Sequence, residues 1–240
     1  MKVLRESGSY QKNKVRKKLF LVITCIITFV ILFVPALPNT PFFIDVGDFE
    51  MSRNLFSVIP VILGMRWWGE YKNFKLGLEG ENHVKKILKS LPDEYYLIND
   101  ASHPNVYGNI DHIILAPNGI FVIETKNYRG KINCHDDDWS KTSGGKIGRS
   151  PSKQAKGNAY ELKNIIESLE QFKSFKLWVQ PIVFFSNYDV ELNVKNSPDF
   201  PVKILESPFE LLNYIMTYRK YQFSPQELDL IRNEILRQTS

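Results

Sequence analysis

The stretch from Asn109 to Gly130 constrains the fold more than any other part of this 240-residue chain. Two apolar, β-branched runs, Ile110–Ala116 and Ile120–Ile123, are separated by Pro117-Asn118-Gly119. Because proline fixes φ while asparagine and glycine tolerate positive φ, this spacing predicts a β-hairpin. A turn centred on Pro117 and Asn118 makes the numbers of cross-strand partners sum to about 235. The hairpin therefore sets Asp111 opposite Glu124.

Glu124 and Lys126 lie two residues apart, so they point to the same side of their strand. Asp111 and Glu124 are expected to have Cβ atoms about 5 Å apart, and two carboxylates at that separation can share one divalent cation such as Mg²⁺. A neighbouring lysine can act on a water molecule that attacks a phosphodiester. The alternative is an edge-strand salt bridge with a solvated Lys126, and the Glu-x-Lys triplet by itself favours that interpretation.

The surrounding pattern resembles the nuclease-related domain, NERD, a branch of the PD-(D/E)xK restriction-endonuclease-like nucleases. The resemblance runs from about Leu76 to Leu169 and rests on motifs in the family's order. These are Gly77-Leu78-Glu79-Gly80-Glu81 with Val84, Asn109-Ile110-Asp111-His112-Ile113, Asn118 to Gly130, Trp139, and Ser150-Pro151 followed by Gln154. Two positions depart from the pattern: Asn109 stands where Gln is as common, and Ser150-Pro151 replaces Asn-Pro.

The resemblance implies an α/β fold with a restriction-endonuclease-like core, a mixed central sheet flanked by helices. It also implies a nuclease that acts on nucleic acid, expected to be DNA, with Mg²⁺ or Mn²⁺. The functional positions carried over are Glu81, Asp111, Glu124, Lys126 and Gln154.

Specific roles follow for these positions. Asp111 and Glu124 would bind the metal, and Glu81 would be an additional or water-mediated ligand. Lys126 would act on the attacking water and Gln154 on its orientation. Flanking phosphates would meet Arg129 and Lys153. Considered without the resemblance, Glu81 is a helix N-terminal acid favoured by the helix dipole, and Gln154 is a surface glutamine.

The net charge of +5 and pI near 9.0 do not by themselves indicate nucleic-acid binding. Residues 1–18 hold seven Lys or Arg against one Glu, so the remainder has 24 basic against 25 acidic residues. Only the segment from Lys141 to Lys156 is locally basic. A solvated loop explains this segment equally well.

Two apolar runs precede the nuclease-like motifs. The first, within 19–37, is long enough to predict a membrane-spanning helix, with a cleaved signal peptide as the alternative. The second, within 55–68, predicts a second crossing or a re-entrant segment, because its apolar part is short and contains Pro60. Five basic residues precede the first run, so the positive-inside rule predicts a hairpin whose two ends face the cytoplasm.

The domain organisation expected from these patterns has six parts: a basic cytoplasmic tail at 1–18, a transmembrane helix at 19–37, an external loop at 38–54, the second membrane segment at 55–68, the nuclease-like domain at 75–206, and C-terminal helices at 207–240. The protein would be held at a lipid bilayer, with the nuclease-like domain on the cytoplasmic side.

Within the nuclease-like domain, apolar spacing predicts a helix from Gly80 to Ser90 and a first strand from Tyr95 to Ile98. Lys131–Cys134 is expected to continue the hairpin's sheet. Pro151 opens a helix, Leu177–Phe185 and Val202–Leu205 are strands, and helices cover Phe209–Tyr218 and the segment after Ser224. His112 alternates to the face opposite Asp111 and is interpreted as structural.

A rival function remains open: a membrane-tethered module that keeps the nuclease fold and binds nucleic acid or a protein without catalysis. Cys25 and Cys134 lack the spacing of a zinc site or a disulfide framework.

Overall fold

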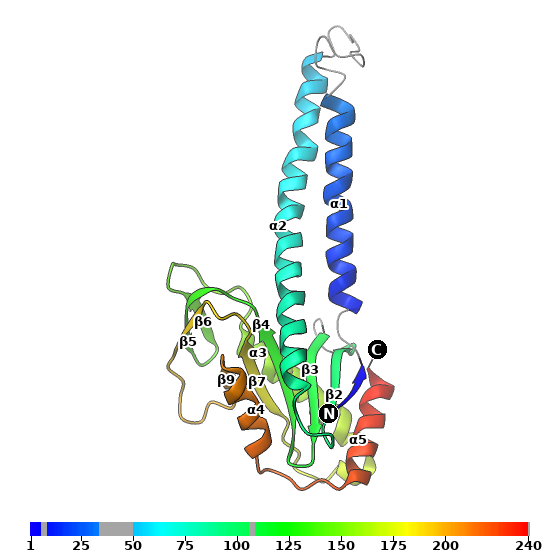
Figure 1. The fold of residues 1–240 in the computed structure, drawn as a ribbon, viewed down its shortest axis with the longest axis vertical. Coiled ribbons are helices and arrows are strands. Elements are labelled where there is room, and N and C mark those ends of the chain that lie inside the picture. Colours follow the sequence, from blue (N-terminus) through cyan, green and yellow to red (C-terminus); the bar gives the residue numbers. More distant parts are fainter. Residues whose placement is uncertain (6–8, 34–49, 106–108, 240) are drawn as a thin grey trace. The chain divides into compact units, whose positions relative to one another are not determined.

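The computed structural model describes residues 1–5, 9–33, 50–105 and 109–239 (Figure 1). The chain divides into two compact units. The sheet unit consists of Met1–Gly8 and Glu79–Ser240, and the helical unit of Ser9–Leu78. The helical unit is therefore an insertion after the first strand of the sheet unit.

A six-stranded sheet forms the centre of the sheet unit, in the order β1-β2-β3-β4-β7-β9. Its strands are β1 (Lys2–Arg5), β2 (Tyr96–Ser102), β3 (Asn109–Ala116), β4 (Gly119–Lys126), β7 (Gln180–Phe185) and β9 (Lys203–Leu205). β2, β3 and β4 pair in antiparallel fashion, whereas β1 joins β2, β7 joins β4 and β9 joins β7 in parallel. The expected mixed sheet is confirmed.

Helices cover both faces of this sheet (Figure 1). On one face lie α3 (Pro151–Glu167), the short 3-10 helix η3 (Glu170–Phe172) and α5 (Pro225–Gln238). On the other lie the end of α2 (Glu50–Leu88) and α4 (Pro208–Thr217). Ser224 and Glu227 form a capping box at the start of α5, which satisfies backbone donors that the first helical turn cannot pair.

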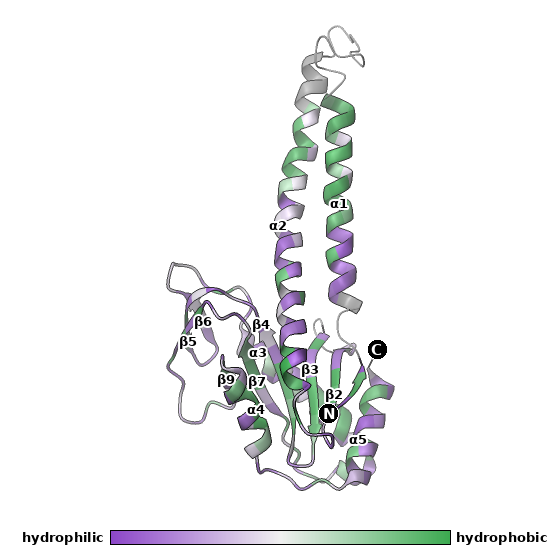
Figure 2. Ribbon diagram, in the orientation of Figure 1, coloured by the Kyte–Doolittle hydropathy of each residue, from purple (hydrophilic) through white to green (hydrophobic). Residues whose placement is uncertain are grey.

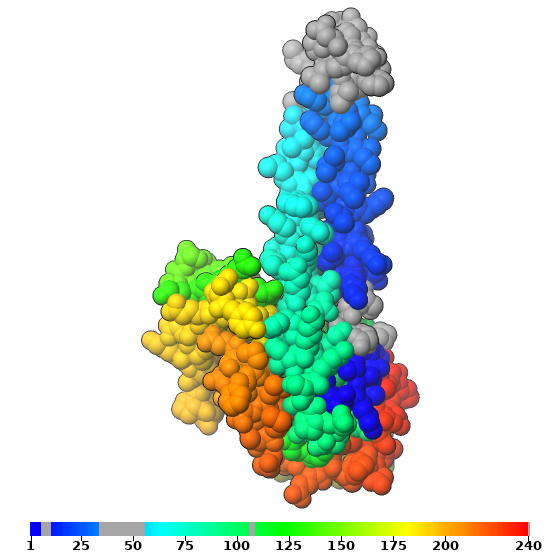
Figure 3. All heavy atoms as spheres, viewed as in Figure 1, coloured from blue at the N-terminus to red at the C-terminus, as the bar shows by residue number. Residues whose placement is uncertain are grey.

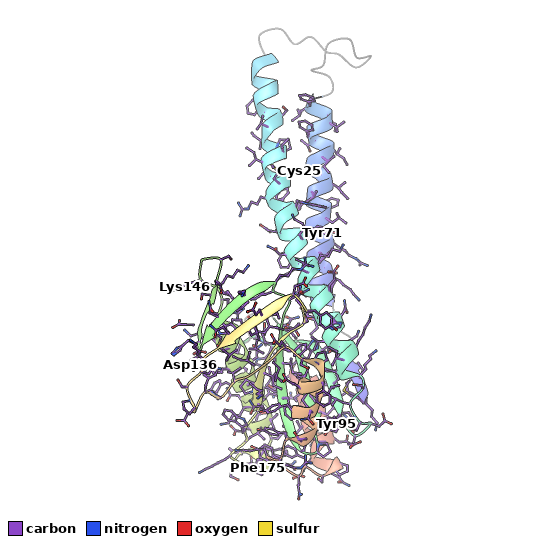
Figure 4. The ribbon with its side chains drawn as sticks, turned by 60° about the vertical axis from the view of Figure 1, so that its left-hand side comes forward. Cys25, Tyr71, Tyr95, Asp136, Lys146 and Phe175 are labelled. Atoms are coloured by element: carbon purple, nitrogen blue, oxygen red, sulfur yellow. The ribbon has the colours of Figure 1, made fainter. Side chains whose placement is uncertain are left out.

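A second, three-stranded sheet corrects one prediction. β5 (Gly130–His135) does not continue the hairpin's sheet but pairs with β6 (Asp138–Lys141) and β8 (Val190–Val194). The chain turns out of the first sheet at Gly130, whose φ of 80° suits glycine. Figure 4 places Asp136 and Lys146 at this second sheet.

The first residues also differ from the prediction of a basic tail over 1–18, because residues 2–5 form edge strand β1 and residues 9–18 belong to α1 (Ser9–Phe33). Arg5 donates hydrogen bonds from Nη1 to Thr239 Oγ1 (3.1 Å) and from Nη2 to the Thr239 carbonyl (2.9 Å). Asn99 Nδ2 donates to the Arg5 carbonyl at 2.7 Å. β1 and α5 lie side by side in Figure 3. The sequence missed β1 because only long-range pairing defines so short a strand.

Arg5→Ala should lower the free energy of unfolding of the sheet unit by about 1–3 kcal/mol, because it removes two hydrogen bonds from a charged donor. A matched control is Arg219→Ala. Arg219 also donates two hydrogen bonds, both to carbonyls within three residues on the exposed surface, and its loss should cost under about 0.5 kcal/mol. Urea unfolding of both variants tests this, and equal losses would contradict a structural role for β1.

In the helical unit, the predicted segment at 55–68 is not a separate element. It is part of α2, a continuous 39-residue helix that includes Pro60. Lys18 Nζ lies 2.5 Å from Glu70 Oε2 and links α1 to α2 within this unit. Residues 50–54 of the predicted external loop are also helical, while 38–49 lie outside the described residues.

The prediction of membrane-spanning helices is not supported: within the described residues, no helix is both long and apolar enough to cross a membrane. Of the first predicted span, residues 34–37 lie outside the described part, and the helical part is preceded directly by charged residues at 16–18. Figure 2 shows the apolar residues gathered toward the end of α1 and the beginning of α2. Several are exposed, among them Phe20, Ile31, Ile62 and Met65.

Candidate active site

The β3–β4 hairpin has the predicted register. His112 pairs with Ile123 and Ala116 with Gly119, so partner numbers sum to 235. The turn is anchored by Asn118, whose Nδ2 donates to the carbonyls of Ile215 (2.7 Å) and Tyr218 (3.0 Å) at the end of α4. These bonds satisfy carbonyls that a helix end leaves unpaired. The turn is thereby held at one place in the sheet unit.

Lys126 lies at the centre of the site. Its Nζ donates to Glu124 Oε1 at 2.6 Å and to Gln154 Oε1 at 3.2 Å, so it connects β4 with the first turn of α3. Glu124 is 1% exposed. Three of the five predicted positions are therefore in direct contact. The alternative of a solvated Lys126 is wrong, because only 15% of its side chain is exposed.

Asp111 lies in β3, one residue before His112, the first residue of β3 that pairs with β4. Its Oδ2 accepts a hydrogen bond from the Thr125 backbone N–H at 2.8 Å. Burial raises the pKa of Asp111 well above its ordinary value, and the carboxylates of Glu124 and Glu81 raise it further. Lys126 and the Thr125 N–H oppose this shift. Asp111 is therefore within electrostatic reach of both other predicted carboxylates.

Glu81 approaches from α2 and is 6% exposed. Its position depends on Gly80, which lies tightly against the ends of β4 and β7. A Cβ at Gly80 would be 2.7 Å from Ser186 Oγ and 2.9 Å from Asn127 Cβ. Only glycine permits this approach of the helix.

Gly80→Ala should destabilise the sheet unit by about 1–3 kcal/mol through overpacking. Gly77, also in α2, has no neighbour within 4 Å of an added Cβ, so Gly77→Ala should stabilise by about 0.5–1 kcal/mol through helix propensity. Thermal denaturation of the two variants compares them directly. Equal stabilisation by both would show that Gly80 does not hold α2 against the strands.

Burial by itself would lower the pKa of Lys126, but the adjacent Glu124 and Asp111 carboxylates outweigh it and raise that pKa above its ordinary value. Lys126 is consequently an ammonium at neutral pH. It can donate hydrogen bonds to a water or stabilise negative charge, and it is poorly suited to remove a proton.

The donor chemistry of the site fits a hard divalent cation. Three carboxylates, from Glu81, Asp111 and Glu124, are set against one ammonium, and the other two carboxylates add to the rise in the pKa of Asp111 that burial causes. Mg²⁺ and Mn²⁺ prefer such oxygen ligands. Among the described residues, however, no three His, Cys, Asp or Glu side chains are already gathered as a metal-binding group. The fit is therefore one of chemistry and not of preformed coordination geometry.

The start of α3 is fixed by contacts with Asp137, which lies between β5 and β6. Asp137 Oδ1 accepts from Ser152 Oγ at 2.7 Å, and Asp137 Oδ2 accepts from Lys156 Nζ at 2.6 Å. Trp139 Nε1 also donates to Ser152 Oγ (3.0 Å). Ser150 caps the helix by accepting from the Lys153 N–H. These contacts hold Gln154 in place.

Arg129 and Lys153, the predicted phosphate-binding residues, are exposed, Arg129 between β4 and β5 and Lys153 in the first turn of α3. Arg129 Nε lies 3.9 Å from Asp189 Oδ2 on the surface, and Lys153 precedes Gln154 on α3.

His112 has the predicted structural role: it is fully buried, its Nδ1 lies 2.7 Å from Asn99 Oδ1, and burial lowers its pKa to about 3.

Asn158 also belongs to the site, although the sequence did not predict it as a site residue. Its side chain is 3% exposed, and its Nδ2 donates to Glu124 Oε2 at 3.4 Å. The available signal was its spacing, because Asn158 lies four residues after Gln154 and so on the same face of α3.

The fold and site thus define a mixed α/β domain with a buried carboxylate–lysine cluster at the ends of its central strands. Residues 76–186 match the family model of NERD, the nuclease-related domain, so this part of the chain is a nuclease-related domain. The match contains four strands of the large sheet, α3 and all five site residues.

The chain is also 45% identical over 60 residues to an uncharacterized protein of Bacillus anthracis. The alignment covers 23% of this chain and 28% of that relative, so the chain spans less than a third of the relative's length. No solved structure matches the chain.

Proposed function

We propose that this protein is a metal-dependent nuclease of the PD-(D/E)xK type that hydrolyses phosphodiester bonds of DNA. The observation that carries the proposal is the partly buried contact of Glu124, Lys126 and Gln154, with Asp111 within electrostatic reach. A nuclease-related domain supports nucleic acid as the partner.

In the proposed reaction, a water loses one proton as its oxygen forms a bond to phosphorus, one ester P–O bond breaks, and the leaving alkoxide takes up one proton. Asp111 and Glu124 would hold Mg²⁺ or Mn²⁺, with Glu81 as an additional ligand. That ion would polarise a non-bridging phosphate oxygen and lower the pKa of a bound water. Gln154 would orient the water through its amide, and Arg129 and Lys153 would bind flanking phosphates.

The role proposed for Lys126 is more specific than the action on the attacking water that the sequence suggested. Because its pKa is raised, it would stabilise the developing charge and orient water as a cation. Asn158 would act as a positioning residue that holds Glu124 Oε2.

A cleavage assay with the full chain tests this function. Linear, nicked and branched DNA, with RNA as a further substrate, would be incubated with Mg²⁺, Mn²⁺ or a chelator. The proposal expects metal-dependent shortening of DNA that is lost in Asp111→Ala. Intact DNA in every form, or equal cutting by Asp111→Ala, would overturn it.

The second candidate is a binding module without turnover. The contact that favours it is the Lys126–Glu124 ion pair, which already neutralises one of the proposed metal ligands. Calorimetric titration with a divalent metal separates the two candidates. A nuclease should bind the metal and lose this binding on Glu124→Ala, whereas a module without catalysis should show no such Glu124-dependent binding.

Association with a lipid bilayer is part of the proposal for cellular location. The exposed apolar side chains of the helical unit, including Phe20, Ile31 and Ile62, support it. β1, which precedes the inserted helical unit, pairs with β2, which follows it, in the six-stranded sheet. Both ends of the helical unit would therefore face the same compartment, proposed to be the cytoplasm. Cell fractionation and protease treatment of spheroplasts test this; digestion of the sheet unit in intact spheroplasts would contradict it.

A further inference from the structure

A groove of about 340 Å³ lies beside α3, separate from the carboxylate–lysine site. Lys156, Tyr160 and Lys163 line it from the helix. These residues follow i, i+4, i+7 spacing and form one stripe of α3. Gln154 and Asn158, which face Lys126 and Glu124, belong to a different stripe. One helix therefore connects the candidate active site with the groove.

The inner lining is apolar, and two aromatic rings remain accessible at the groove. Ala159, Val179 and Pro181 are buried, whereas Tyr160 is 61% and Trp178 37% exposed. A volume of about 340 Å³ is at the lower end of the range for small-molecule sites. It suits a single planar ring system.

Trp178 is held in a fixed position before any ligand arrives. Its Nε1 donates to Gln180 Oε1 at 3.1 Å, and its backbone N–H donates to Tyr221 Oη at 2.5 Å. Because the polar atom of the indole is already paired, the ring offers mainly its π-face. A ligand would gain stacking contact here without ordering the side chain.

The two lysines give the groove its charge preference. Lys163 Nζ lies 3.6 Å from Glu167 Oε1 in a surface i,i+4 pair, and such pairs contribute only about 0.2–0.5 kcal/mol. A phosphate can therefore compete for this ammonium. Lys156 is held more closely by Asp137, at 2.6 Å. The groove thus combines apolar and aromatic surface with cations at its rim.

We propose that this groove binds an unpaired nucleobase of a single-stranded or frayed nucleic acid, with the base stacked on Tyr160 and Trp178 and its phosphate near Lys163. Bases in a duplex are already stacked and paired, so only an unstacked base can enter. The inference deepens the proposed function, on which it rests for its ligand class, by naming unpaired strands as the preferred substrate.

The test is equilibrium binding of labelled oligonucleotides to the full chain by fluorescence anisotropy, without divalent metal so that no cleavage occurs. Tyr160→Ala should weaken binding of a single strand about tenfold, leave duplex binding unchanged, and be rescued by Tyr160→Phe. Tyr160 is an exposed helix residue, so alanine should preserve the fold. Phe209→Ala is the matched control, because Phe209 is 77% exposed on α4, outside the groove.

Unchanged single-strand affinity in Tyr160→Ala, equal losses for duplex and single strand, or no strand binding by the wild type would each overturn the inference. A nucleoside monophosphate that binds as tightly as the strand would also overturn it, because the groove would then be a free-nucleotide pocket. Tyr160-dependent binding without any metal-dependent cleavage would instead leave the inference standing and refute the proposed nuclease activity.

Discussion

Replacing Glu124 with glutamine should abolish metal-dependent cleavage while leaving the protein folded. Glutamine has the same shape and retains an oxygen that can accept the hydrogen bond from Lys126 Nζ, which now reaches Glu124 Oε1 at 2.6 Å. What it loses is the negative charge that would hold the cation. A metal contact worth about 4 kcal/mol in the transition state corresponds to roughly a thousandfold loss in kcat.

The matched control for this variant is Glu191→Gln. Glu191 lies on β8 and pairs with Lys131 Nζ at 3.1 Å, but both side chains are about two-thirds exposed. Cleavage rates should be unchanged, because a solvated strand-surface pair contributes little. Single-turnover kinetics at saturating Mn²⁺, with circular dichroism as the check on folding, compare the variants. A Glu124→Gln enzyme that cuts within a factor of about ten of wild type would leave the charge of Glu124 without a catalytic role.

Asp111→Asn should make the metal-free protein more stable at neutral pH, even though it removes a proposed ligand. The pKa of Asp111 in the folded state is raised above its ordinary value of 3.8, chiefly by burial, so the folded state binds this proton more tightly than the unfolded state. The resulting stabilisation is present below pH 3.8 and is lost as pH rises through the folded-state pKa. Asparagine does not titrate, and its Oδ1 can still accept from the Thr125 N–H.

Thermal unfolding in a chelator, followed from about pH 4 upward, measures this effect. The midpoint of the D111N variant should rise relative to wild type as pH increases. Each 1 kcal/mol gained corresponds to roughly 2–4 °C. Saturating Mn²⁺ should reverse the order, because ligand binding stabilises the folded wild type. Asp189→Asn changes a carboxylate that is 75% exposed. Its unfolding midpoint should therefore change with pH in parallel with that of wild type. Parallel curves for Asp111→Asn would show that Asp111 is not a destabilising buried acid.

The sequence was most informative where structure depends on near neighbours. The hairpin register followed from the turn at Pro117 and Asn118 and from the two-residue period of strands. Because side chains two residues apart on a strand point to the same side, Glu124 and Lys126 were correctly placed on one side of β4. The capping box at Ser224 is another short-range signal, and α5 begins there.

Long-range features were predicted poorly. β1 is a four-residue strand whose partner, β2, lies more than ninety positions later in the chain. β5 was assigned to the wrong sheet, because pairing with β8 leaves no local pattern. Pro60 counted toward a separate re-entrant segment at 55–68, yet α2 continues through it. In each case the outcome depends on tertiary contacts that override local preference.

In the candidate site, too, the sequence predicted short-range features better than long-range contacts. Contact of Lys126 with Gln154 requires α3 to pack at a particular place on the sheet, and only the family resemblance indicated it. Asn158 had no motif of its own. Glu81 reaches the site because Gly80 lets α2 approach the strand ends, which is a matter of packing that no residue pattern encodes.

Isothermal titration of the metal-free full chain with Mn²⁺ tests the central claim most directly. If Asp111, Glu124 and Glu81 form a site for a divalent cation, the wild type should bind Mn²⁺, and Glu124→Gln should bind none at that site. Wild-type protein that takes up no Mn²⁺, or a Glu124→Gln variant that binds it equally well, would contradict the account.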